Sequence, residues 1–300
     1  MIADAILIER VLIYGVLGLR FWDGATDQAI GDGLRVAATP AGMSAPWVEA
    51  TSNRSGVLAF HRLPGLHSTP FEKADCTRAY IIEVHDEFER YLPFRFTAHA
   101  CSQLMTALET DTESPLAPDA GIPLFNAAAR TVPAAMAVIR AEVHDAASSD
   151  PENTPAPFAR LTVDIAGADG APDVTAVGVA DEKGRVTVIL PQPAPSEVPL
   201  ESPLAPVAAN GPSPLSAQTW PVKLRASYAT PKDPNALMDL DLVLAAPDAE
   251  LASAVGGPFT SSLTFTLAYG LGLAEEVATP APGWLPITPV LFVRSSVSPP

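Results

Sequence analysis

Apolar and polar residues alternate along short stretches of this chain, and turn-forming residues separate the stretches. At 94–97, for example, Phe94 and Phe96 alternate with Arg95 and Thr97. Successive residues of a strand point to opposite faces of a sheet, so this pattern predicts strands with one buried face. The predicted strands are 18–22, 33–38, 47–51, 57–61, 80–85, 91–97, 137–143, 160–165, 175–179, 185–190, 221–228, 240–244, 263–269 and 290–294. We therefore expect a mainly β protein.

The order of strands and turns repeats once along the chain. In the first copy, a strand at 20–23 precedes the turn Asn53-x-x-Gly56, and in the second a strand at 141–145 precedes the turn Asp181-x-x-Gly184. The two turns lie 128 positions apart. A fixed order that recurs in this way predicts two tandem copies of one small antiparallel β-sandwich module. Such modules usually present surfaces, so surfaces are the first place to look for function.

Five segments follow from this pattern. They are an N-terminal segment 1–15, a first β-sandwich module 16–98, a linker 99–134, a second module 135–246 with a Pro-rich loop at 191–218, and a C-terminal β- and Pro-rich extension 247–300.

The Pro-rich loop and the C-terminal extension each have two alternative interpretations. Eight prolines lie between Pro191 and Pro214, which favours an extended chain because proline lacks the donor that helices and sheets need. The loop either follows a neighbouring subunit or is a surface insertion. The extension either completes the sheet of the second module, which we favour, or is donated as a strand to a partner.

Two segments decide whether a membrane is involved. Residues 251–274 have no charge and are long enough to span a bilayer, but period-two alternation and the Gly256-Gly257-Pro258 interruption favour β-structure instead. Residues 1–14 lack a basic region and a cleavage site, so no signal peptide is predicted. We expect a cytoplasmic protein without membrane insertion, whose two cysteines, Cys76 and Cys101, are free thiols unless they pair with each other.

The composition excludes some partners. The net charge is −16, and a chain this acidic repels phosphate backbones and anionic lipids. Because of this charge we expect no nucleic-acid binding.

The 32 prolines argue against an all-helical fold.

No enzyme motif is present, and we expect neither catalysis nor a cofactor. His144 and Asp145 are adjacent on a predicted strand, so their side chains point to opposite faces and cannot form a catalytic pair. Four residues, Cys76, His85, His99 and Cys101, are the weak candidates for a metal site, although their spacing matches no compact zinc motif. Two acidic clusters are expected to be solvated loops, because they lack the spacing of a calcium loop; they are Asp86, Glu87 and Glu89, and Glu109, Asp111 and Glu113.

Tryptophans offer an alternative function, because an exposed indole ring stacks on sugars. Trp22 and Trp220 lie on or beside predicted strands and are expected in the core. Trp47 and Trp284 adjoin loop-forming Pro or Gly residues and are expected to be exposed. A glycan-binding module thus remains a minor interpretation.

Several sequences in the chain together resemble a known family. The runs at 18–23, 53–60 and 181–188 resemble carboxypeptidase-regulatory-like, transthyretin-like β-sandwich modules. The longer runs at 91–96, 122–126, 131–145 and 218–226 are similar to bacterial proteins associated with contractile injection systems, the phage-tail-like particles. The resemblance covers about residues 18–230.

This resemblance implies a function rather than a set of site residues. It implies a non-enzymatic structural component at the cap or baseplate, with sheath, tube, cap or baseplate proteins as partners, contacted through loops and the C-terminal tail. The residues that match look like fold determinants, so no catalytic, cofactor-binding or metal-binding residue is implied. The alternative is a β-sandwich module that binds glycans or proteins outside any particle.

Overall fold

A computed structural model describes residues 17–66, 77–101, 121–166, 173–193, 218–277 and 283–295, and these residues are mainly β, as predicted. The elements are β1 (Leu17–Asp23), β2 (Gln28–Ile30), β3 (Leu34–Pro40), β4 (Val48–Glu49), β5 (Thr51–Ser52), β6 (Val57–Phe60), β7 (Thr77–Asp86), β8 (Phe94–Cys101), β9 (Ile122–Leu124), β10 (Met136–Asp145), β11 (Arg160–Ile165), β12 (Val174–Val179), β13 (Arg185–Pro191), β14 (Thr219–Ser227), β15 (Met238–Asp239), α1 (Leu240–Leu244), β16 (Asp248–Ala252), β17 (Leu263–Ala268), β18 (Gly272–Val277), β19 (Gly283–Pro286) and β20 (Val290–Ser295).

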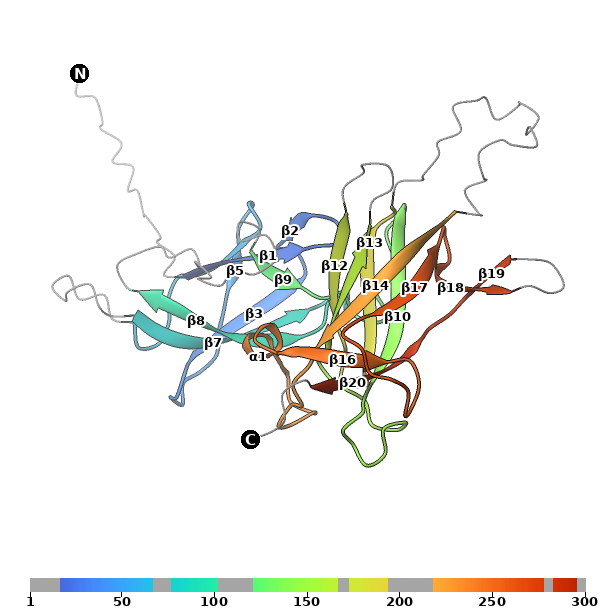
Figure 1. The fold of residues 1–300 in the computed structure, drawn as a ribbon. Coiled ribbons are helices and arrows are strands. Elements are labelled where there is room, and N and C mark those ends of the chain that lie inside the picture. The colour runs from blue at the N-terminus through green and yellow to red at the C-terminus, as the bar shows by residue number, and fades with distance from the viewer. Residues whose placement is uncertain are drawn as a thin grey trace, which may run out of the picture.

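The first half of the chain forms lobe 1, in which two five-stranded sheets enclose one core (Figure 1). One sheet has the order β2-β1-β6-β5, with β9 also paired to β1, and the other has the order β15-β8-β7-β3-β4. Large side chains from both sheets are fully buried between them, among them Phe21, Phe60, Tyr80 and Phe94. This arrangement is consistent with the predicted sandwich class.

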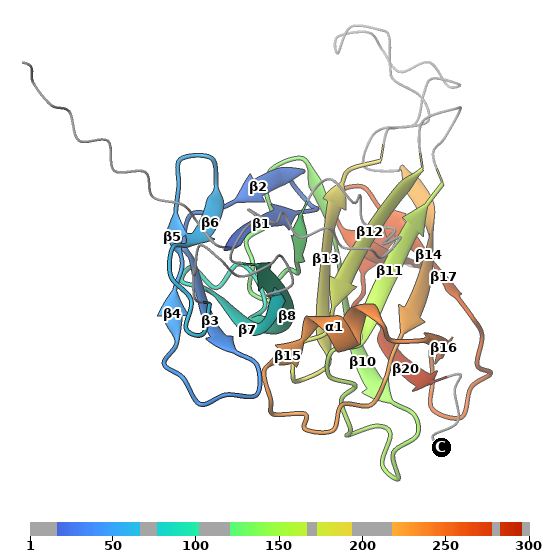
Figure 2. The ribbon, with the colours of Figure 1, turned by 90° about the vertical axis from the view of Figure 1, so that its left-hand side faces the viewer.

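The second half forms lobe 2, a ten-stranded sheet that curls around its own core (Figure 2). The strand β14 lies at the centre, paired with β11 along one edge and with β16 and β17 along the other. The strand β12 lies beside β13, and a Cβ atom on Gly178 would lie 2.8 Å from a methyl group of Val188. A glycine at this position therefore allows the two strands to approach closely.

The two lobes have different sheets but share two strand pairings around the predicted turns. In each lobe the first strand pairs antiparallel with the strand that follows the turn, β1 with β6 and β10 with β13. In each lobe a short late strand also pairs in parallel with the end of the first, β9 with β1 and β20 with β10. Because β20 completes this sheet, the favoured expectation for 290–294 is confirmed.

The two predicted turns have the same hydrogen bonds. The Asn53 side chain accepts from the backbone N–H groups of Ser55 and Val57 at 2.9 and 3.0 Å. Asp181 accepts from those of Lys183 and Arg185, both at 2.9 Å. The glycines that end these turns have φ values of +74° at Gly56 and +77° at Gly184, a region in which other residues are strained.

The strand predicted at 240–244 is wrong, because these residues form the helix α1. The Asp239 side chain caps the helix by accepting from the backbone N–H of Leu242 at 3.4 Å. Leu240 and Val243, three positions apart, are buried on one side of the helix, whereas Leu242 is exposed. The run Leu-Asp-Leu-Val-Leu fits both a strand and a helix pattern, and the cap decides between them.

Helix α1 and β15 pack on lobe 1 although they follow β14 of lobe 2 in the chain. The strand β15 extends the β8 sheet in parallel, and Met238, Leu240 and Val243 belong to the core of lobe 1. The Asp241 carboxylate accepts from the backbone N–H of Thr97 at 2.8 Å. The segment 238–244 therefore closes the edge of lobe 1 where β8 begins.

Part of the segment expected as a linker also belongs to lobe 1. Residues 102–120 of the predicted linker 99–134 lie outside the described residues, but β9 pairs with β1 and Phe125 is buried in the core of lobe 1. Lobe 2 in turn contributes Val177, Val179 and Phe158 to that core. The two lobes are therefore packed against each other.

The uncharged segment 251–274 contains strands rather than a helix, as expected. Within the described residues, α1 is the only α-helix, and nothing there has the length and apolarity that a membrane-crossing helix requires. The expected N-terminal segment 1–15 and all of the Pro-rich loop between 194 and 217 lie outside the described residues.

Candidate interaction surface

The four weak metal candidates do not converge. His85 and His99 are both exposed on the β7–β8 ladder, but His99 lies opposite Ala79, six residues along β7 from His85. At about 3.3 Å per residue this separation is roughly 20 Å, too far for one ion to bind both. Cys76 and the side chain of Cys101 lie outside the description. No group of three or more His, Cys, Asp or Glu residues among the described ones is placed to hold a metal ion.

The neighbours His144 and Asp145 point to opposite faces of β10, as predicted. The His144 ring packs 5.7 Å from the ring of Phe292, and its Nδ1 lies 3.1 Å from the Pro151 carbonyl oxygen. Asp145 is buried and accepts a hydrogen bond from the Tyr228 hydroxyl at 3.1 Å. Burial and the nearby Asp145 carboxylate raise the pKa of Tyr228 above its ordinary value of 10.0, so this hydroxyl stays protonated and serves as a donor in the core.

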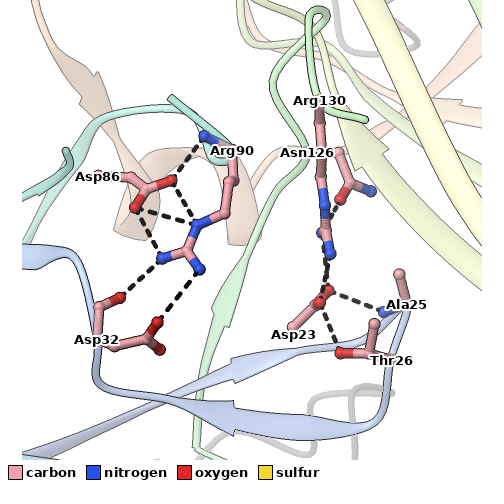
Figure 3. Close-up of polar contacts among 8 residues, drawn as sticks. All are labelled: Asp23, Ala25, Thr26, Asp32, Asp86, Arg90, Asn126 and Arg130. Atoms are coloured by element: carbon pink, nitrogen blue, oxygen red, sulfur yellow. Dashed lines mark hydrogen bonds and ion pairs between the residues drawn. The ribbon is translucent and has the colours of Figure 1, made fainter. Parts of the chain in front are cut away.

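A buried ion pair lies at the equivalent position of lobe 1, where β1 ends (Figure 3). Arg130 donates to the two carboxylate oxygens of Asp23 at 3.0 and 2.6 Å and also to the side-chain oxygen of Asn126. Thr26 donates to the same carboxylate at 2.7 Å. Burial alone would raise the pKa of Asp23, but the hydrogen bonds from Arg130 and Thr26 outweigh it and lower the pKa. The pair fastens the segment after β9 to the end of β1.

The acidic cluster at 86–89 divides into two kinds of residue. Asp86 is not solvated as expected, because its side chain is 1% exposed and binds the Arg90 guanidinium at 2.9 Å and the Arg90 backbone N–H at 2.6 Å (Figure 3). Arg90 also donates to the Asp32 carbonyl oxygen at 2.7 Å. Glu87 and Glu89 are exposed, as predicted. The second cluster, Glu109, Asp111 and Glu113, lies outside the described residues.

The tryptophans follow the expectations only in part. Trp220 is buried and Trp47 is 45% exposed, both as predicted. Trp22 is not in the core, because it lies on the outer face of β1, where the Arg20 guanidinium is 5.3 Å from its ring centroid. Trp284 is half-buried on β19. The strand β1 has two faces, and its period alone does not say which of them carries Trp22.

Two concave regions have lining residues that do not form a reaction centre. A pocket of about 130 Å³ lies between the lobes, where Leu92, Phe158 and Met238 meet the Asp181–Arg185 turn. This volume is below the several hundred Å³ of an ordinary substrate site. A larger groove of about 560 Å³ follows the outer face of β11 and β14, but its Asp164 carboxylate is already bound by Arg225 at 2.9 Å and Thr175 at 3.0 Å.

Exposed apolar side chains are the remaining feature that indicates a contact surface. Those most exposed are Met43, Trp47, Phe88, Leu242, Val255, Tyr269, Leu271, Leu285 and Val290. Three of them belong to the meander β17–β18–β19: Tyr269 and Leu271 lie in the turn between β17 and β18, and Leu285 lies on β19. The β18–β19 hairpin projects from lobe 2 on the side away from lobe 1 (Figure 1), and we call it the arm.

The described part of the arm has a buried root, and the pairs beyond the root, which we call the tip, carry the exposed side chains of Glu275, Glu276 and Leu285. At the root, Leu273 and Ala274 of β18 are buried, and the backbone N–H of Ile287 donates to the Leu273 carbonyl oxygen at 2.8 Å. Beyond Ala274, Glu275 and Glu276 are both exposed, and across the ladder Glu275 pairs with Leu285, which is 57% exposed. The tip is therefore a two-stranded ribbon that presents apolar and acidic side chains together.

The C-terminal extension 247–300 was expected to contact partners, but the arm within that extension was not identified from the sequence. The expected strand 263–269 identified β17, but β18 and β19 follow it without the regular alternation that predicts strands. The signal that was available for β18 is the pair of turn glycines Gly270 and Gly272, which follows the apolar run of β17 as in a hairpin.

Comparison with known proteins identifies no relative: no family model, no curated protein and no solved structure matches this chain.

Proposed function

We propose that this protein is a non-enzymatic structural component of a contractile injection system, at the cap or the baseplate of a phage-tail-like particle assembled in the cytoplasm. Its partners would be sheath, tube, cap or baseplate proteins. The observation that carries the proposal is the combination of two lobes packed into one body with an arm, bearing exposed apolar and acidic side chains, directed away from it. The identity of the particle rests on the sequence resemblance alone.

The contacts within and between the lobes support the proposal. A subunit that transmits force or positions neighbours needs internal contacts that resist shear, and here lobe 1 is closed by residues of the second half of the chain. The buried polar groups described above bind one another, as in a scaffold. The ionisable groups Asp23, Arg130 and Asp145 are engaged in bonds between segments rather than directed into a substrate cavity.

Sedimentation tests the proposal directly. High-molecular-weight particles from a native lysate are pelleted and analysed by mass spectrometry. We expect this chain to pellet together with sheath and tube proteins. Recovery in the supernatant alone would overturn the particle assignment.

A deletion tests the expected contact made by the Pro-rich loop. Removal of residues 193–214 should leave both lobes folded, because the deleted residues connect the ends of β13 and β14. We expect circular dichroism to be unchanged and incorporation into particles to be lost. A particle that forms normally with the shortened chain would exclude the loop as an assembly contact.

The exposed Trp47 supports the alternative of a glycan-binding module. An indole ring that is 45% exposed offers a face for stacking against a sugar. If this alternative is correct, a glycan array will show binding that the Trp47→Ala variant loses. Absence of binding on the array would remove it.

A further inference from the structure

We infer that the arm docks onto a neighbouring subunit that is not a second copy of this chain, by inserting Leu285 into an apolar pocket bordered by lysine or arginine. The inference rests on the proposed function in one respect, namely that the partner belongs to the same particle. It is carried by the exposure, charge and register of the β18–β19 hairpin.

The first step is that the tip of the arm lacks a packing partner among the described residues. Leu285 is 57% exposed on β19, and β19 pairs with β18 but with no further described strand. An isolated two-stranded ribbon is marginally stable in water, so its apolar residues are stabilised only when a third surface covers them. Leu285 lies opposite Glu275, one pair beyond the root pair of Ala274 and Pro286, and an exposed leucine on such a ribbon is typical of a contact residue.

The second step is the charge of the partner. Glu275 and Glu276 are exposed, and neither makes an ion pair or a hydrogen bond with a described residue. Residues that pair across an antiparallel ladder share a face, so Glu275 lies on the face of Leu285 and Glu276 on the face of Trp284. Each face of the tip thus combines one apolar side chain with one carboxylate, which is complementary to an apolar pocket with a basic border.

The third step is that the net charge disfavours a second copy as the partner. Each copy has a net charge of −16, so two copies repel each other as they approach. A partner with a basic surface is attracted by the same charge. Charge therefore favours a different subunit.

The fourth step distinguishes side-chain insertion from strand addition. The strand β19 has only four residues and ends at Pro286, which has no backbone N–H to donate. Short edges that end in proline resist pairing with another strand. Leu285 and Glu275, which share one face, therefore provide the contact rather than the backbone, and Glu276 on the other face adds to the negative charge of the tip.

Photo-crosslinking of the full chain in its native cells tests the inference. A photoreactive benzoylphenylalanine replaces Leu285 in one variant and Val255, which is 48% exposed elsewhere on lobe 2, in a control variant. After illumination, particle and soluble fractions are separated and the adducts are identified by mass spectrometry. We expect the variant at 285 to crosslink to one protein other than this chain, at a peptide with neighbouring Lys or Arg, at least about tenfold more than the control. An adduct no stronger than the control, a second copy as the partner, or an acidic crosslinked surface would overturn the inference.

Charge variants test the electrostatic part. The double variant Glu275→Lys/Glu276→Lys is expected to reduce the amount of chain in the partner's fraction by at least about tenfold, whereas Glu152→Lys, an exposed acid on another loop of lobe 2, is expected to leave it unchanged. The neutral variant Glu275→Gln/Glu276→Gln should reduce the salt dependence of binding. An equal loss in the Glu152→Lys control would contradict the assignment.

The two proposals fail in different ways. If the chain does not pellet with sheath and tube proteins but position 285 still crosslinks to a basic protein, the arm inference stands and the particle function fails. If the chain does pellet with them but position 285 crosslinks no more than position 255, the particle function stands and the arm inference fails.

Discussion

Asp23 and Asp145 hold corresponding positions in the two lobes, at the end of the first strand, yet each is satisfied in a different way. Both accept from a backbone N–H two residues later, that of Ala25 at 3.1 Å and that of Ala147 at 2.9 Å. Asp23 is then neutralised by Arg130, whereas Asp145 accepts from the Tyr228 hydroxyl. The shared geometry fixes the strand end, and the charged partner fastens a distant segment in lobe 1 only.

The Asp23→Asn substitution should destabilise the protein by about 3–5 kcal/mol at pH 7, because it leaves the buried Arg130 without its counter-charge. The pKa of Asp23 in the folded state lies below its ordinary value of 3.8, so its contribution is complete at neutral pH and is lost as the pH falls below about 4. The difference between wild type and variant in urea unfolding should therefore shrink between pH 7 and pH 3. A double variant, Asp23→Leu/Arg130→Met, should lose less stability than the single one, and an equal or greater loss would contradict this account.

The matching turn glycines allow a second comparison. Alanine at Gly56 would place its Cβ atom 3.9 Å from the backbone nitrogen of Gly31, an ordinary van der Waals contact, and would cost only the strain of a positive φ, about 1 kcal/mol. Alanine at Gly184 would in addition place its Cβ atom 2.3 Å from the Val143 carbonyl oxygen, so we expect about 1–3 kcal/mol more. Chemical denaturation of both variants measures the difference. Equal losses would show that the second turn relaxes freely.

At the scale of elements, α1 is the piece that joins the lobes. Its buried side enters the core of lobe 1, and Arg160 of β11 donates to the carbonyl oxygen of Leu244, at the end of α1, at 3.3 Å. Burial lowers the pKa of Arg160, and Asp248 opposes this effect. A five-residue helix has little stability of its own, so α1 persists because both lobes hold it.

The α1 helix provides its own matched pair of variants. Leu240 is 3% exposed and Leu242 is 67% exposed. Leu240→Ala should cost about 2–5 kcal/mol through the cavity it leaves, and Leu242→Ala should change stability by less than about 0.5 kcal/mol. Thermal or chemical unfolding of both variants tests this. A similar effect of the two substitutions would mean that α1 does not pack as described.

Sequence patterns predicted the turns and most strands, whose structure depends on neighbouring residues, but did not predict contacts between segments that are far apart in the chain. The Asn53 and Asp181 turns and the alternating strands were predicted, because their hydrogen bonds lie within a few residues. The pairing of Asp23 with Arg130 spans 107 positions, and β9 joins β1 from about a hundred residues away, so no local pattern reveals either contact. The C-terminal extension was expected to make contacts, but the arm within it was not identified, because exposure depends on what the rest of the fold leaves uncovered.

At the scale of the molecule, the two lobes behave as one body because each depends on the other. Phe158 has a positive φ of +63°, which is a strained conformation for a large residue, and its ring packs against the core of lobe 1. Val179 of β12 is fully buried in the same core. The contact between lobes is thus part of a hydrophobic core rather than a loose interface.

Calorimetry should therefore show one unfolding transition, with a calorimetric enthalpy equal to the van't Hoff enthalpy. The Val179→Asp substitution buries a charge between the lobes and should lower the whole transition, whereas Val255→Asp, at an exposed position, should leave it in place. Two separate transitions in the wild-type protein would show that the lobes are independent domains.

The return of residues 238–244 to lobe 1 also sets an order of events during synthesis. The backbone N–H of Thr97 donates to the Asp241 carboxylate, and Asp241 is synthesised 144 residues after Thr97. At a translation rate of about 5–20 residues per second, this delay is roughly 7–30 s. During that time the beginning of β8 is an open edge on the nascent chain, available to a chaperone or to a neighbouring chain on the same messenger RNA. The protein can reach its final form only when nearly all of it has left the ribosome.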